Sequence, residues 1–116
     1  MEIGVERGEH ARVIRVSGDV DLYHSHRLKD AVTELAAEAR SGIVLDLGGA
    51  AYIDSSGVGV LIYANSVCTK RGIPLRLVNL SDPVRRVLEL TKLTSYLPLA
   101  DSEESAIREF GGDGGS

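Results

Sequence analysis

The sequence DSSGVG at residues 54–59 stands where a run of strand-type residues ends and a helical pattern begins. Asp and Ser are preferred at a helix start, because their side chains accept hydrogen bonds from backbone N–H groups that lack partners inside the helix. Those N–H groups and the helix dipole also favour added negative charge. We therefore predict a helix start at this point, with chemistry suited to a regulatory phosphoserine.

The residues on either side of this motif predict a strand between two helices. Residues 43–47 (IVLDL) are nearly continuous in large apolar side chains, as expected of a central parallel strand covered on both faces. Apolar residues recur at helical spacing over 28–39 and over 57–68, so a helix is expected on each side of that strand. Gly42 and Gly72 mark the expected ends of these helices.

Weaker signals complete the predicted fold. Strands are expected at 3–5, 11–16, 75–79 and 97–99, and further helices from Ser81 and from Ser102 to about Phe110. A turn-like break separates the first two strands, which should therefore form a hairpin, whereas Pro98 restricts the last strand to an edge. The pattern predicts an α/β fold, with a mixed sheet of four to five strands and helices packed on it.

The length of 116 residues predicts one domain, because it is enough for a single core and too short for two ordinary ones. The last six residues, GGDGGS, contain nothing to bury. We expect a domain over residues 1–110 and a disordered Gly-rich tail over 111–116.

Composition argues against several classes of partner. The net charge is −4, the basic residues are scattered, and aromatic residues make up 4% of the chain, so we expect no binding of nucleic acid. No apolar run approaches the ~18 residues of a membrane-spanning helix, and the first residues lack the pattern of a signal peptide. The expectation is a cytoplasmic protein, without a membrane partner, that is a monomer or a weak dimer.

Two pairs of residues invite a metal site, and neither supports one well. Asp19 and Asp21 are two carboxylates without a further cluster of ligands, which is more typical of a solvated loop or a helix cap. His24 and His26 are two residues apart, so on a helix they point to different faces. We expect surface histidines, and neither a metal nor a cofactor.

A hydrolase is also disfavoured. The serines at 55 and 56 lack the Gly-x-Ser-x-Gly elbow of a nucleophilic serine. The three histidines all lie in the N-terminal quarter, and nothing in the sequence places one beside the serines. The sequence therefore predicts a protein that is not an enzyme.

Four segments together resemble the STAS domain family, and within it the stand-alone bacterial anti-sigma factor antagonists. They are GDVD at 18–21, IVLDL at 43–47, YIDSSGVGVL at 52–61 and GIPL at 72–75, and the resemblance spans nearly the whole chain. The chain departs from it at Lys92, where many relatives carry glycine, so the turn there is expected to differ. The residues before the motif, GGAA at 48–51, are also unusually small.

The resemblance implies a switch protein. Its unmodified form would bind an anti-sigma factor with a histidine-kinase-like ATPase fold and so release the sigma factor. The same partner would be a serine kinase acting on the second serine of the motif, Ser56, and a PP2C-type phosphatase would remove the phosphate. The alternative is a constitutive STAS scaffold, or a subunit of a stress-sensing or lipid-transport complex.

The expected partner surface surrounds Ser56. Helical geometry places Val58 and Ile62 away from the core stripe, so both should lie exposed beside the hydroxyl. A phosphate on Ser56 would add roughly −1.5 to −2 charges next to several carboxylates. Ser55 is expected to cap the helix start or to support the site. The predicted partner-binding residues are Asp19, Asp21, Asp54, Ser55, Ser56, Gly57, Val58 and Ile62.

Overall fold

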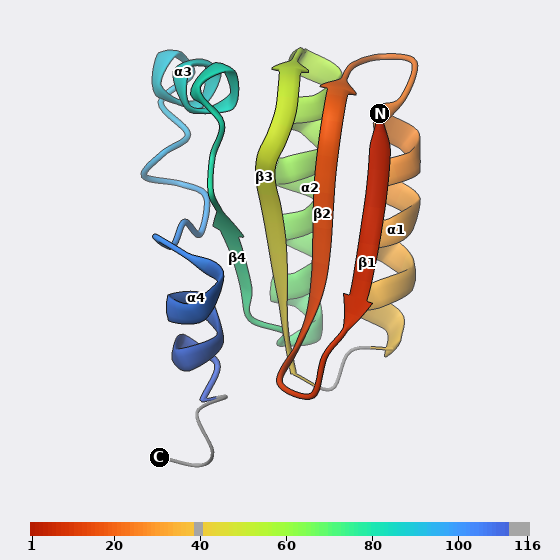
Figure 1. Ribbon diagram of the computed structural model, residues 1–116, viewed down its shortest axis with the longest axis vertical. Helices are drawn as coiled ribbons and strands as arrows, with labels where there is room; N and C mark the ends of the chain where they lie inside the picture. The colour runs from red at the N-terminus through yellow and green to blue at the C-terminus, as the bar shows by residue number, and fades with distance from the viewer. Residues whose placement is uncertain (39–40, 112–116) are drawn as a thin grey trace.

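The computed structural model describes residues 1–38 and 41–111, and over them the chain forms one mixed sheet with helices packed on it (Figure 1). The strands are β1 (Glu2–Arg7), β2 (Ala11–Val20), β3 (Gly42–Ile53) and β4 (Leu75–Val78), and the helices are α1 (Ser25–Glu38), α2 (Ser55–Arg71), α3 (Asp82–Leu90) and α4 (Glu103–Glu109). Their order in the sheet is β1-β2-β3-β4. β1 runs antiparallel to β2, while β3 is parallel to both of its neighbours.

Two hydrophobic clusters hold the layers together. The larger cluster joins one face of the sheet to α1 and α2, which lie side by side behind it in Figure 1, and includes Leu28, Leu45 and Leu61. The smaller cluster lies on the opposite face, where Ala106 of α4 covers Val44 and other strand residues. β3 is therefore covered on both faces near its start, as its continuous apolar sequence predicts.

The predicted hairpin and the central parallel strand are confirmed, with longer strands than expected. The small residues 48–51 continue β3, so that strand runs directly into the serine motif. Gly42 is the first residue of β3 rather than a helix stop, and a Cβ there would lie 2.2 Å from the ring of Phe110. The predicted end of α1 at residue 39 and the tail residues 112–116 lie outside the described residues.

The predicted fifth strand is wrong. Residues 97–99 make only an isolated bridge to β4, between Leu77 and Leu99. The N–H of Leu77 donates to the carbonyl of Pro98, and the carbonyl of Leu77 accepts from the N–H of Ala100. Pro98 itself has no N–H to extend the ladder, so pairing stops there.

The turn after α3 adopts a backbone conformation that usually requires glycine. Lys92 has a φ of 60°, and the following N–H of Leu93 donates to the carbonyl of Leu88. Lysine therefore occupies a left-handed position at an energetic cost, and the helix still ends in a tight hydrogen-bonded turn. Within the described residues, no helix is both long enough and apolar enough to cross a membrane.

Candidate phosphoserine and partner-binding site

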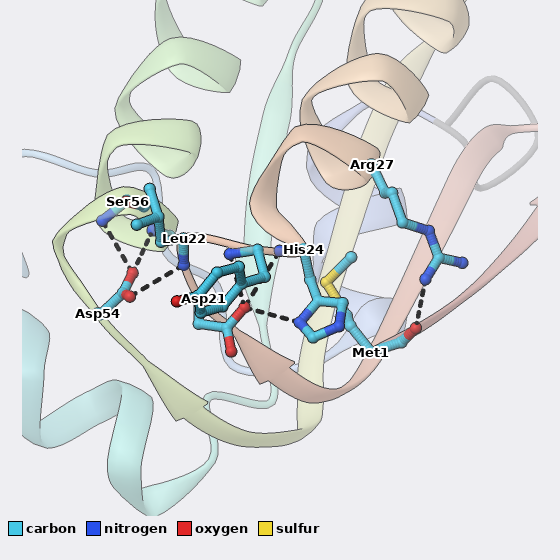
Figure 2. Close-up of polar contacts among 9 residues, drawn as sticks. Met1, Asp21, Leu22, His24, Arg27, Asp54 and Ser56 are labelled. Atoms are coloured by element: carbon cyan, nitrogen blue, oxygen red, sulfur yellow. Dashed lines mark hydrogen bonds and ion pairs between the residues drawn. The ribbon is translucent and has the colours of Figure 1, made fainter.

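The serine motif lies where two strands end side by side. β2 and β3 are parallel and pair as far as Val20 and Ile53, so their carboxyl ends meet at one edge of the sheet. The loop from β2 into α1 and the first turn of α2 consequently lie next to each other (Figure 2). In α/β sheets this edge is where binding sites are usually built.

The side chain of Asp54 joins these two segments. Its Oδ1 accepts hydrogen bonds from the backbone N–H of Ser56 at 2.9 Å and of Gly57 at 3.1 Å. Its Oδ2 accepts a third from the backbone N–H of Leu22 at 3.0 Å, in the loop after β2. Figure 2 shows the carboxylate between the two segments, so Asp54 both caps α2 and fastens the neighbouring loop.

Gly57 allows α2 to start this close to the sheet. A Cβ at this position would lie 2.4 Å from the carbonyl oxygen of Val20 and 2.7 Å from Cγ1 of Ile53. No side chain fits in that space without moving the helix or the strand end. The packing of the helix start against the strand ends therefore requires glycine at this position. This close packing also holds the neighbouring serines near the edge of the sheet.

The two serines differ in exposure. Ser55 is exposed and Ser56 is half-buried. The cap uses the backbone N–H of Ser56 and not its hydroxyl. Ser56 thus lies two residues after the capping aspartate, in the first turn of the helix, where the helix dipole favours negative charge.

Asp21 caps the start of α1 in a similar way. Its Oδ1 accepts from the N–H groups of Tyr23 and His24, both at 3.1 Å, and lies 2.7 Å from Nδ1 of His24 (Figure 2). Burial raises the pKa of Asp21, but the hydrogen bond and charge of His24, together with the two backbone N–H groups, outweigh it and leave the pKa below its ordinary value. The cap interpretation of this aspartate fits the structure.

The other candidate ligands stay apart. Asp19 is exposed on β2 and pairs in register with Tyr52 of β3, and His26 is exposed on α1. Over residues 1–38 and 41–111, no group of three or more His, Cys, Asp or Glu side chains is placed to hold a metal. The pairing of His24 with Asp21 was not predicted, although an Asp-x-x-His spacing before a helix could have indicated it.

The expectation that Val58 is exposed is wrong. Its side chain is 9% exposed and belongs to the main core, while Ile62 is half-buried and packs against that core. The reason is that α2 packs against both the sheet and α1, so its buried face is wider than one helical stripe. The accessible face of its first turns consists of Ser55, Ser56, Gly59 and part of Ile62.

Comparison with known proteins agrees with this architecture. The STAS domain model matches residues 2–106. The chain belongs to the STAS domain family. This STAS domain is 26% identical over 111 residues to the anti-sigma F factor antagonist of Paenibacillus polymyxa, with 95% of each protein covered. It is 34% identical over 92 residues to the anti-sigma-B factor antagonist of Listeria monocytogenes, with 78% of this chain and 79% of that protein covered.

A solved structure shows the same fold. The STAS domain superposes with a TM-score of 0.70 on the Bacillus cell fate determinant SpoIIAA in its phosphorylated form, over 93% of this chain and 98% of that one. The sequence identity is 23%, so this likeness concerns the fold.

Proposed function

We propose that this STAS domain is an anti-sigma factor antagonist whose binding is switched off by phosphate on Ser56. The observation that carries the proposal is the position of Ser56 in the first turn of α2, where its backbone N–H bonds to a capping aspartate that also holds the neighbouring loop. The names of its curated relatives and the existence of a phosphorylated SpoIIAA support this reading.

The helix start can accept a phosphate without unfolding the domain. A phosphoserine carries roughly −1.5 to −2 charges, and the positive end of the α2 dipole offsets part of that charge. The hydroxyl that would carry it takes no part in the cap. The fold is therefore expected to survive phosphorylation nearly unchanged.

The partner surface, in contrast, changes strongly. The phosphate would lie beside the carboxylate of Asp54, with Asp21 and the exposed Asp19 at the same edge of the sheet. A partner fitted to a neutral hydroxyl would have to bury an uncompensated dianion, at a cost of about 2–5 kcal/mol. This is enough to turn a stable complex into an unpopulated one.

The enzymes of the switch follow from the same proposal. The anti-sigma factor, with a histidine-kinase-like ATPase fold, transfers the phosphate from ATP to Ser56, and a PP2C-type phosphatase removes it. In this scheme the antagonist is a substrate and a binding protein, and it has no catalytic residue.

A phosphorylation assay tests the proposal. The chain is incubated with each histidine-kinase-like anti-sigma factor of the source genome and ATP, and the products are mapped by mass spectrometry. We expect one phosphate, at Ser56, in the wild type and in the Ser55→Ala control, and none in Ser56→Ala. If no partner adds phosphate and cells contain no phosphorylated form, the chain is a constitutive scaffold instead.

A further inference from the structure

Two large apolar side chains stand exposed beside the candidate site. Leu22 is 67% exposed and Tyr23 is 78% exposed, and both belong to the loop between β2 and α1. We propose that these two residues are the apolar anchors through which the anti-sigma factor partner holds this surface. The inference rests on the proposed function, and it adds to that function the residues that supply most of the affinity.

The loop that carries these side chains is held in place before any partner arrives. The N–H of Leu22 donates to Asp54 and the N–H of Tyr23 donates to Asp21. The next residues close the first turn toward α1, since the N–H groups of His24 and Ser25 donate to the carbonyl of Asp21. A preordered loop loses little conformational freedom on binding, so its exposed side chains make effective anchors.

The side chains are also of the right kind. A tyrosine has a large apolar ring and few rotatable bonds, and tyrosine is enriched among residues that dominate binding energies. Tyr52 is also exposed, at 51%, but it lies within β3 and not on this loop. Leu90 is the last residue of α3 and Tyr96 lies in the segment that follows it, and neither has a backbone N–H bonded to Asp54 or Asp21.

The surrounding charge indicates the chemistry of the partner. Asp19 is exposed near the end of β2, Asp54 lies under the loop, and Asp21 is paired with His24. A matching surface would offer an apolar pocket for the leucine and tyrosine, with lysine or arginine at its rim. A second copy of this chain would instead bring like charges together, so the geometry favours a different protein.

Asp54 connects the anchors to the switch. The same carboxylate bonds to the backbone N–H of Ser56 and of Leu22, so the serine and the anchors lie on adjoining segments. In this proposal a partner that buries Leu22 also covers Ser56. The phosphate would therefore act against the contacts that carry the most affinity.

A set of matched variants tests this inference. Binding to each histidine-kinase-like anti-sigma factor of the source genome is measured by calorimetry for the wild type, for Leu22→Ser/Tyr23→Ser and for Leu90→Ser/Tyr96→Ser. The first variant should bind at least ~30-fold more weakly, and the control within about threefold of the wild type. Tyr23→Phe keeps the ring and should also bind within about threefold. Circular dichroism melting checks that each variant is folded.

The outcomes separate this inference from the function on which it rests. If the wild type binds, Ser56→Asp does not, and the Leu22/Tyr23 variant binds as the wild type does, the proposed function stands and the anchors are disproved. If both variant pairs lose affinity equally, the anchors are again disproved, because the loss is not local. If no anti-sigma factor binds the wild type, the proposed function and the proposed role of Leu22 and Tyr23 are both disproved.

Discussion

The starts of α2 and α4 are both capped, but the two caps reach different distances along the chain. At α4, Ser102 and Ser105 exchange hydrogen bonds between side chain and backbone, all within four residues. At α2, Asp54 bonds to its own first turn and also to Leu22, 32 residues away. The local cap stabilises one helix, whereas the long-range cap joins the helix that carries Ser56 to the loop that carries Leu22. A phosphate on Ser56 can therefore affect both segments.

The largest effect on stability should come from removing the long-range cap. Asp54→Ala removes a helix cap and a hydrogen bond from a charged acceptor to a second segment, so we expect a loss of about 2–4 kcal/mol in the free energy of unfolding. Ser102→Ala, at the local cap of α4, should cost about 1 kcal/mol. Urea unfolding of both variants measures the difference, and equal losses would mean that the bond to Leu22 contributes nothing.

The next largest effect on stability is expected at Gly57, and Gly59 in the same helix should respond in the opposite direction. Gly57→Ala brings a methyl group against the carbonyl of Val20, so we expect a loss of about 1–3 kcal/mol in stability. At Gly59 a Cβ meets no atom within 4 Å, and Gly59→Ala should stabilise the helix by about 0.5–1 kcal/mol. Thermal melting of the two variants checks the opposite signs, and a stabilised Gly57→Ala would show that the close approach of α2 is not required.

The smallest effect is a dependence on pH at the second aspartate cap. The folded pKa of Asp21 lies below its ordinary value of 3.8, so its ionised form contributes stability at higher pH and that contribution is lost as the pH falls through the folded pKa. Asp21→Asn should therefore be less stable than the wild type above about pH 4, with the gap closing below it. Unfolding measured from neutral to acidic pH checks this, and a gap that widens in acid would contradict it.

The comparison of the caps also explains what the sequence could predict. The signal at Ser102 and the helix start after Asp54 are local, so residue types and spacing were enough to place them. The bond from Asp54 to Leu22 depends on two strands ending side by side, which no local pattern contains. The site residues on α2 were therefore placed correctly as a helix start, while the exposed apolar pair at Leu22 and Tyr23 was missed.

The burial of Val58 was missed for a related reason. Periodicity gives the face of a helix that points to the sheet, but not the width of that face when a second helix packs alongside. The strand at 97–99 failed because apolar residues do not show how far a segment pairs with its neighbour, and here only Leu77 and Leu99 form a bridge. Both errors concern contacts between elements, and neither changes the topology that brings the motif to the edge of the sheet.

The central claim is that charge on Ser56, and not charge anywhere on this helix start, prevents binding to the anti-sigma factor. Calorimetry of Ser56→Asp against the matched variant Ser55→Asp tests it most directly, with Ser56→Ala as the unmodified reference. We expect Ser56→Asp to lose binding by at least ~30-fold while its melting temperature stays close to that of the wild type, and Ser55→Asp and Ser56→Ala to keep most of their affinity. Equal affinities of the wild type and Ser56→Asp would contradict the account.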